Sequence, residues 1–174
     1  LPFSNGCTAC AGCPNDMRGR MTPGTDDRCS QCMMRHEHCV CRDMPQLDID
    51  FDILVVRHWK ERQKPSNTAR LAALAIPNLS IIDYGGAGER WDPETLNVPS
   101  PALLFPSADA SPLPSPPKTI VVVDGSWPQA RKLVNKLPHL SAMPRIQVAP
   151  LSIAPTRLRQ PPIPEGMCTI EAIA

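Results

Sequence analysis

A group of four closely spaced cysteines is the feature of this sequence best suited to chemistry. It occupies the stretch CSQCMMRHEHCVC and consists of Cys29, Cys32, Cys39 and Cys41. Four thiolates at this spacing can close a tetrahedral shell around zinc, which leaves no open position for a substrate. The spacing therefore predicts a structural zinc site, with free buried thiols as the alternative. His36 and His38 lie inside the loop and are expected on the surface, although either could replace a ligand.

Three further cysteines, Cys7, Cys10 and Cys13, form the stretch CTACAGC. Their spacing is similar to that of an iron–sulfur or a second zinc motif, but no fourth ligand lies nearby and Cys168 is far away in the sequence. A second metal and a metal-free tail therefore stay open as alternatives. Because no secretory signal opens the chain, clustered Cys-x-x-Cys pairs favour metal over disulfides.

The stretch VVVDGSW places an acid and an indole on one tight turn. Asp124 follows a run of β-branched residues, and Gly125 would let another backbone approach closely. Asp124 is therefore a candidate base or substrate-positioning acid, and a helix-entry aspartate that binds backbone amides is the alternative. Ser126 is better explained as a helix cap than as a catalyst. Trp127 could stack on a base or pack in the core.

A basic stretch, RHWKERQKPSNTAR, offers contacts for nucleic acid. Its polar members could bind phosphates or bases, which would make RNA affinity depend on salt, and Trp59 could stack on an unpaired base. A solvated helix entry is the alternative for each one. The candidate phosphate or base contacts are Arg57, His58, Lys60, Arg62, Lys64, Asn67 and Arg70.

Alternating strand and helix patterns must position these residues. Strands are expected over 51–56, 79–83, 101–106, 118–124 and 145–150, and helices over 66–76, from 126 to 137 and from 169 onwards, with Ser66 or Asn67, Ser126 and Thr169 as caps. This alternation predicts an α/β fold with a mostly parallel sheet flanked by helices. Ligands of such sheets bind beyond the carboxyl ends of the strands, where Asp124 to Trp127 falls. A metal-binding module over 1–45 and a second domain over 46–174 are expected.

The composition limits the classes of function. Lys and Arg number 18 against 17 acids in 174 residues, so a local basic patch is possible but no global basic field attracts polyanions. Mean hydropathy is −0.20, and no apolar run approaches the ~20 residues of a membrane helix. A soluble cytoplasmic protein without a membrane partner is expected. The chain begins with Leu and stops within CTIEAIA, so both termini are expected to be incomplete.

Five blocks in a fixed order resemble the DTW-domain family, the tRNA-uridine aminocarboxypropyltransferases. They are the module with Cys-x-x-Cys and Cys-x-Cys, then RHWKERQKPSNTARL, ALLFPS, VVVDGSW and RLRQPPIPEGMCTIEAIA. Ser126 stands where the family usually has Thr, and Cys168 where it typically has Ser. The resemblance implies a SPOUT-like fold, whose C-terminal part can be knotted, and binding of S-adenosylmethionine. It also implies transfer of the 3-amino-3-carboxypropyl group to the imide nitrogen of a tRNA uridine, which releases methylthioadenosine.

This reaction gives the candidate residues provisional roles. Asp124 or Glu171 would act as the acid or base, although Glu171 would also suit the helix dipole. Arg159 would lie near the carboxylate of S-adenosylmethionine, and Arg157 would contact tRNA. The expected S-adenosylmethionine site comprises Leu104, Phe105, Pro106, Ser107, Asp124, Gly125, Ser126, Trp127, Arg159, Thr169 and Glu171.

Three other functions stay open on the sequence. A SPOUT-type RNA methyltransferase would share the co-substrate, and an aminocarboxypropyltransferase acting on rRNA would share the chemistry. A non-catalytic RNA-binding protein with a zinc module would need no small-molecule pocket, and it would leave the run from VVVDGSW to TIEA unexplained.

Overall fold

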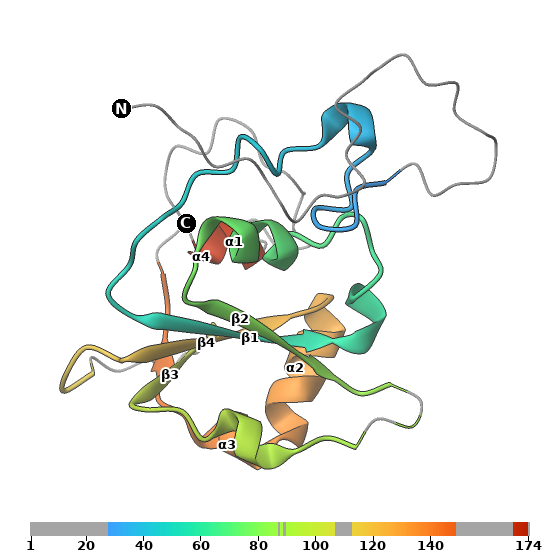
Figure 1. Cartoon of the computed structure of the whole chain (residues 1–174). Helices are drawn as coiled ribbons and strands as arrows, with labels where there is room; N and C mark the ends of the chain where they lie inside the picture. The colour runs from blue at the N-terminus through green and yellow to red at the C-terminus, as the bar shows by residue number, and fades with distance from the viewer. Residues whose placement is uncertain (1–27, 87, 89, 107–112, 149–168, 174) are drawn as a thin grey trace.

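The computed structural model describes residues 28–86, 88, 90–106, 113–148 and 169–173. Within these residues the chain forms a five-stranded sheet in the order β2-β1-β4-β3-β5, and every neighbouring pair is parallel (Figure 1). The parallel α/β sheet expected from the sequence is therefore confirmed. The strands are β1 (Asp52–His58), β2 (Leu79–Tyr84), β3 (Pro101–Leu104), β4 (Thr119–Asp124) and β5 (Arg145–Ile146).

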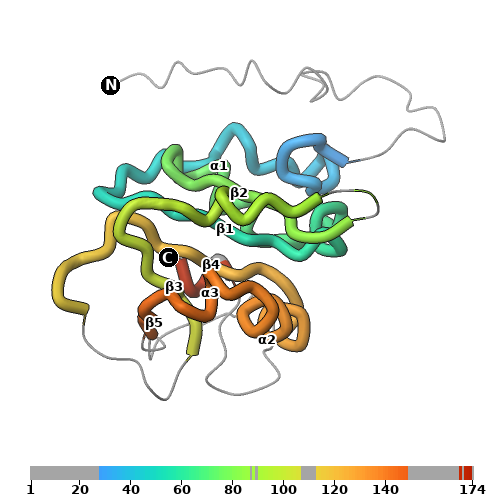
Figure 2. Tube along the Cα trace, turned by 90° about the horizontal axis from the view of Figure 1, so that it is seen from below, coloured from blue at the N-terminus to red at the C-terminus, as the bar shows by residue number. Residues whose placement is uncertain are grey.

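Helices cover both faces of the sheet. One face, above the strands in Figure 1, carries α1 (Ala69–Ala75) and α4 (Thr169–Ile173). The other face carries α2 (Trp127–Lys136) and α3 (Pro138–Ala142), and Figure 2 looks at the molecule from this side. Short 3₁₀ turns are η1 (His36–His38), η2 (Trp59–Glu61) and η3 (Pro93–Leu96). This double cover is what a parallel sheet requires, because its strands are apolar on both sides.

Two apolar clusters fill the space between the helices and the sheet. Ile53 and Val55 of β1 pack in the cluster under α1, and Leu54 and Val56 pack in the cluster with α2 and α3. Successive side chains of a strand point to opposite faces, so a strand buried on both sides has no polar alternation. This explains why ILVV, residues 53–56 of β1, is a continuous apolar run.

Some boundaries differ from those expected. The strand expected over 145–150 is confined within the described residues to Arg145–Ile146. Helix α1 begins at Ala69 after Thr68, later than expected, but the Asn67 side chain still accepts a hydrogen bond of 3.3 Å from the backbone N–H of Arg70. Thr169 is the first residue of α4, and its hydroxyl bonds to a strand residue described below.

The segment before β1 crosses the α1 side of the sheet. The backbone N–H of Leu47 donates to Ala75 over 2.7 Å, and the Gln46 amide donates to Leu74 over 2.9 Å. Met44, Ile49 and Phe51 pack against the apolar cluster under α1. The division at residue 45 stays a prediction, although these contacts join the segment from residue 44 closely to α1.

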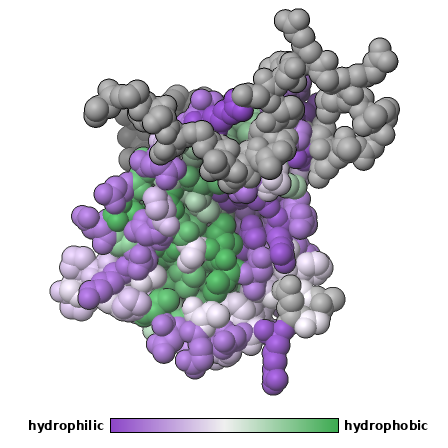
Figure 3. All heavy atoms as spheres, viewed as in Figure 1, coloured by the Kyte–Doolittle hydropathy of each residue, from purple (hydrophilic) through white to green (hydrophobic). Residues whose placement is uncertain are grey.

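Apolar residues gather in the middle of the face seen in Figure 1, and polar residues surround them (Figure 3). Strand β2, at the edge of the sheet, lies on this face, and its residues from Ile81 to Tyr84 are half-buried. Among the described residues, no helix has the length and apolar character needed to cross a membrane. The SPOUT-like topology and its knot stay predictions, because residues 149–168 lie outside the described part of the chain.

Candidate functional site

Three charged residues lie side by side near the carboxyl ends of three strands. Arg57 of β1 is in register with Asp83 of β2 on one side and with Asp124 of β4 on the other. Residues in register on parallel strands project from the same face of the sheet. Arg57, Asp83 and Asp124 project from the face covered by α1 and α4. Val55 lies two positions before Arg57, so it points to the same face, and it packs in the cluster under α1.

Arg57 binds Asp83 through two nearly parallel hydrogen bonds. Its Nε donates to Oδ1 over 2.7 Å and its Nη2 donates to Oδ2 over 3.1 Å. Arg57 is buried. Asp83 forms a second ion pair, with 3.6 Å between its Oδ2 and Nε of Arg62. A two-point contact of this kind holds both side chains in one orientation. Arg57 therefore lies inside the fold and is not part of an exposed RNA-binding surface.

Asp124 has a donor on each of its carboxylate oxygens. The Asn67 amide donates to Oδ2 over 2.5 Å, and the Thr169 hydroxyl donates to Oδ1 over 2.6 Å. The side-chain oxygen of Asn67 in turn accepts a bond of 3.5 Å from Arg57. Asp124 is 5% exposed, and Asn67 is equally buried.

The side chains described so far are linked by a continuous series of hydrogen bonds, which we call the polar network. Its members, in order, are Asp83, Arg57, Asn67, Asp124 and Thr169. It connects β2, β1, the residues before α1, β4 and the start of α4. Asn67, expected at an RNA contact, is instead an internal link. Buried polar groups are costly unless they are bonded, so the network fixes how these elements meet.

The glycine after Asp124 lets three segments come together. A Cβ atom at Gly125 would lie 3.2 Å from Cβ of Gln129 and 3.5 Å from Cβ of His58. Ser126 is the N-cap of α2, and its backbone N–H donates to Oε1 of Gln129 over 2.7 Å. The expected cap at Ser126 is therefore confirmed as part of a capping box.

Aromatic side chains gather where β3, β4 and β5 end. The rings of Phe105 and Trp127 lie 6.4 Å apart at an angle of 56°. The guanidinium carbon of Arg145 lies 5.8 Å from the centre of the Phe105 ring. Leu104 packs on the opposite face, in the cluster under α1. Arg145 was not expected at the site, because only the pairing of β5 with β3 places it there.

The basic stretch divides into buried and exposed members. Trp59 is 43% exposed, and the ammonium of Lys60 lies 5.6 Å from its ring centre. Lys64 pairs with Glu61 at 2.7 Å. Arg62 is exposed, and Arg70 donates to the backbone carbonyls of Arg62 and Lys64.

His58 belongs to the basic stretch and lies close to α2. Partial burial lowers the pKa of its imidazole, and the nearby positive charges of Lys60, Lys64 and Lys132 lower it further, against the opposing charge of Glu61. His58 is therefore biased toward the neutral form, and Lys132 of α2 is close enough to act on it.

The four cysteines of the CSQCMMRHEHCVC stretch meet at one point. Their sulfurs all lie within 4.8 Å of one another, with 3.7 Å between Cys29 and Cys41 and 3.8 Å between Cys32 and Cys39. A tetrahedral ion at about 2.3 Å from each sulfur would separate the sulfurs by about 3.8 Å. The group therefore has the geometry to hold a metal ion.

The sulfurs of the four cysteines differ in how readily they ionise. Burial opposes ionisation of Cys29, but hydrogen bonds from the amides of Cys32 and Gln31 and from neighbouring thiols lower its pKa to about 6. Burial, followed by the neighbouring thiols, raises the pKa of Cys41. His38 is exposed, as expected, and His36 is half-buried; neither belongs to the four-sulfur group.

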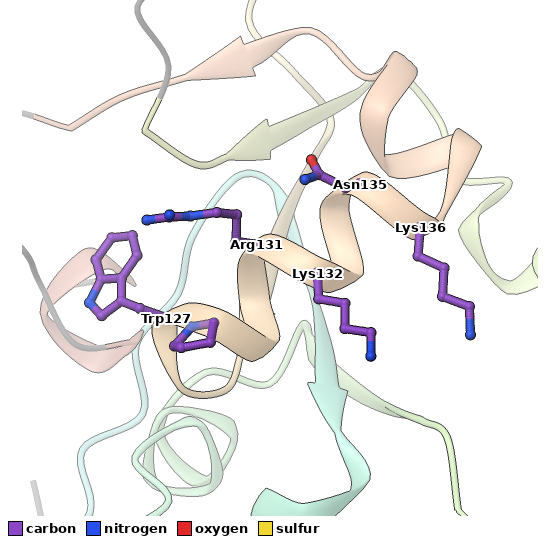
Figure 4. Close-up of a pocket in the computed structure, with 6 residues that line it drawn as sticks. Trp127, Arg131, Lys132, Asn135 and Lys136 are labelled. Atoms are coloured by element: carbon purple, nitrogen blue, oxygen red, sulfur yellow. The ribbon is translucent and has the colours of Figure 1, made fainter.

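A hollow of about 600 Å³ follows the outer face of α2 (Figure 4). Among the residues expected to bind S-adenosylmethionine, only Trp127 lines it. Sequence reasoning did not single out this helix face, although its charges recur at intervals of one helical turn. The lining residues are Trp127, Pro128, Arg131, Lys132, Asn135 and Lys136.

The remaining expected site residues divide into two groups. Pro106 is exposed at the end of β3, and Glu171 is half-buried in the first turn of α4, two residues after Thr169. The others lie outside the described residues: Cys7, Cys10, Cys13, Ser107, Arg157, Arg159 and Cys168.

The chain is similar to several known proteins. It is 25% identical over 167 residues to the tRNA-uridine aminocarboxypropyltransferase 2 of Drosophila melanogaster, a match that covers 87% of this chain and 66% of that protein. Proteins of the same name from Macaca fascicularis and Mus musculus are 26% and 24% identical over 160 residues, which is 84% of this chain and 54% of each relative. The chain therefore spans between about half and two thirds of the length of these relatives. No solved structure matches it.

The model of the DTW domain family matches residues 26–174. The match begins before the four cysteines and includes the DGSW turn and α4. It covers most of the sequence and every residue of the polar network, so the chain belongs to the DTW domain family.

Proposed function

We propose that this chain is an S-adenosylmethionine-dependent tRNA-uridine aminocarboxypropyltransferase. The observation that carries the proposal is the DTW match over residues 26–174, supported by the name that the similar proteins share. The proposed product is a tRNA uridine with a 3-amino-3-carboxypropyl group on its imide nitrogen. A SPOUT-like fold and action in the cytoplasm belong to the same proposal.

The end of β3 and the turn after β4 are the proposed S-adenosylmethionine site. The co-substrate would supply an electrophilic carbon next to a sulfonium. The rings of Phe105 and Trp127 offer aromatic surface on which an adenine would stack, and the guanidinium of Arg145 would bind a carboxylate. Arg159 and Ser107, on the segments that follow β5 and β3, are proposed to complete the site.

The uridine imide must lose its proton, and two carboxylates are proposed to take part. Asp124 accepts from Asn67 and Thr169, so it suits the task of holding the DGSW turn and α4 in position. Glu171 is half-buried and lies two residues from Thr169, which suits proton acceptance at the edge of the site. Asp124→Asn and Glu171→Gln remove the charge of one carboxylate at a time. The variant that lowers the single-turnover rate by about 10²–10⁴-fold identifies the base.

The four cysteines are proposed to hold one structural zinc ion. Their sulfur separations fit a tetrahedral ion, and four thiolates leave no position for a substrate. Zinc would therefore stabilise residues 28–41 without acting in bond formation.

The proposed reaction is tested by its two products. The purified protein is incubated with S-adenosylmethionine and unmodified tRNA. The nucleosides of the tRNA and the adenosine derivatives in solution are then separated and identified by mass spectrometry. An aminocarboxypropyl uridine together with methylthioadenosine is the expected result. A methylated nucleoside together with adenosylhomocysteine would instead identify a methyltransferase, and parallel incubation with rRNA would reveal the other RNA substrate.

A further inference from the structure

Helix α2 combines a buried apolar side with an outer side that carries only positive charge. Ala130, Leu133 and Val134 are buried against the sheet. Arg131, Lys132 and Lys136 are exposed, and the sequence of α2, WPQARKLVNK, contains no acidic residue. We call the exposed side, with the lining residues of the hollow given above, the basic face of α2.

The basic face follows the carboxyl ends of the strands. Helix α2 begins with Trp127, after the short turn that follows β4. Lys132 lies close enough to His58, at the end of β1, to lower its pKa. The ammonium of Lys136 lies 5.8 Å from the ring centre of Tyr84, at the end of β2. In Figure 4, Arg131 reaches toward Trp127, while Lys132 and Lys136 extend from the neighbouring side of the helix.

Two acids near the ends of β1 and β2 are already paired. Asp83 binds Arg57 and Arg62, and Glu61 binds Lys64. No ion pair among the described residues includes a cation of the basic face. The cations of the basic face therefore lack an acidic side-chain partner in the part of the chain that the structure describes, although the whole chain has a formal net charge of only +1.

Two lysines of α2 repel each other, and an anionic ligand would remove this repulsion. Lys132 and Lys136 are four residues apart on one side of the helix, a spacing at which like charges destabilise a helix. A polyanion along the hollow would neutralise these cations, whereas an ordinary protein surface would not.

From this geometry we infer that the basic face of α2 binds the phosphate backbone of the substrate RNA. The inference rests on the proposed function, whose substrate it places on the molecule. The cations on successive turns stand about 5–6 Å apart at their Cβ atoms, so each can meet a separate phosphate of one strand. The face leads to Trp127, and the exposed Trp59 and Lys60 continue it from the end of β1. Phosphate contacts here would position the strand without selecting its sequence.

The test measures how tRNA affinity depends on salt. The dissociation constant of an unmodified tRNA transcript is measured by fluorescence anisotropy between about 50 and 200 mM salt. Arg131→Gln, Lys132→Gln and Lys136→Gln are combined in one variant, and Lys132→Gln is also made alone. Lys118→Gln is the matched control, because Lys118 is an exposed cation before the amino end of β4.

Each lost phosphate contact should reduce the slope of log K against log salt by about one. We expect a reduction of about two to three for the triple variant and about one for Lys132→Gln, with at least roughly tenfold weaker binding by the triple variant at the lower salt. Lys118→Gln should match the wild type. Circular dichroism and the melting temperature confirm that each variant is folded. In multiple-turnover assays the triple variant should raise KM for tRNA and leave the rate at saturating tRNA unchanged.

The inference is wrong if the triple variant binds tRNA with the wild-type slope, or if the wild-type protein binds no RNA. It is also wrong if Lys118→Gln lowers the slope as much as Lys132→Gln, because the effect would then reflect total charge. Product analysis keeps this result separate from the proposed function. A protein that forms the modified uridine while its basic-face variants bind normally would retain its function and use another surface for RNA. Salt-dependent binding through α2 without the aminocarboxypropyl product would support the basic face and reject the reaction.

Discussion

The carboxylate of Asp124 accepts hydrogen bonds from two buried donors, so its replacements should differ sharply in stability. Asp124→Ala leaves the Asn67 amide and the Thr169 hydroxyl without their acceptor. A buried group that loses its partner costs about 1–3 kcal/mol. In Asp124→Asn the oxygen can still accept from Asn67, and the new amide can donate to the Thr169 oxygen once the hydroxyl rotates. Urea unfolding should therefore show a loss of about 2–4 kcal/mol for Ala and about 1 kcal/mol for Asn.

The Asp124→Asn variant is also the variant on which the assignment of the base depends. If it unfolds as easily as Asp124→Ala, the polar network needs the negative charge and not only the hydrogen bonds. A slower reaction in that variant could then not be assigned to lost base catalysis. Thr169→Val, which removes one donor and keeps the shape, gives an independent measure of the same contact.

Gly85 is a second residue whose identity the structure explains. It has a φ of +80°, and a Cβ atom there would lie 2.9 Å from Cδ1 of Trp59. Gly88 has a similar φ of +85°, but a Cβ atom there would have no neighbour within 4 Å. Gly88→Ala should therefore cost about 1–2 kcal/mol from the backbone alone. Gly85→Ala should cost more and shift the Trp59 fluorescence, and equal losses in the two variants would contradict the Trp59 contact.

At the residue level, the sequence predicted types of residue better than their partners. Asp124 could be singled out, because it ends a buried strand at a glycine turn. Arg57 and Asn67 were assigned to RNA because they stand in a basic stretch, yet both are buried in the polar network. Their partners lie on other strands and helices, up to 57 residues away for the pair of Asn67 and Asp124. Local spacing contains no information on such contacts.

The start of α2 gives a prediction at the level of one element. Ser126 is the N-cap of a capping box with Gln129. Ser126→Ala should lower the free energy of unfolding by about 0.5–2 kcal/mol, because alanine cannot accept from the first amides of the helix. Ser126→Thr keeps the hydroxyl and should stay close to the wild type in the same denaturant titration. A threonine variant as unstable as the alanine variant would show that the cap hydroxyl is not the cause.

Strands and helices could be predicted where local patterns are strong. The apolar runs of β1, β2 and β4 indicated buried strands. Pro77 and Pro138 indicated where α1 and α2 end, because proline cannot continue a helix. Strand β5 is shorter than the RIQVAP pattern indicates, since only Arg145 and Ile146 pair with β3. Pairing depends on the length of the neighbouring strand, which a local pattern does not contain.

At the scale of the whole molecule, the parallel α/β class followed from the alternation of elements, but the strand order did not. The order β2-β1-β4-β3-β5 places β4 between β1 and β3. This order brings Asp83, Arg57 and Asp124 into one row, and it sets Phe105 beside Trp127. The candidate site is therefore a product of the sheet order, while the four-cysteine group that could hold a metal lies in one short stretch and could be predicted from the sequence alone.

Removal of the metal should affect more than the cysteine loop. Residues 28–41 precede a segment that packs on α1, through Leu47 bonded to Ala75 and through Met44, Ile49 and Phe51. Cys32 is 1% exposed, so Cys32→Ser removes a proposed zinc ligand and leaves a hydroxyl buried among thiols. We expect freshly purified wild-type protein to hold one zinc ion, and Cys32→Ser to lose it and melt at a lower temperature.

A chelator should lower the melting temperature of the wild type in the same way, and added zinc should restore it, because metal bound only to the folded state stabilises that state. Hydrogen exchange should then rise first in residues 28–51 and α1, while β1 and β4 stay protected in the sheet interior. His38→Ala is the matched control: this exposed histidine lies in the same loop but outside the four-sulfur group, so zinc content should not change. The proposal would be wrong if metal analysis found no zinc in the purified wild-type protein and a chelator left its melting temperature unchanged. The four thiols would then stabilise the fold as buried side chains and not as ligands.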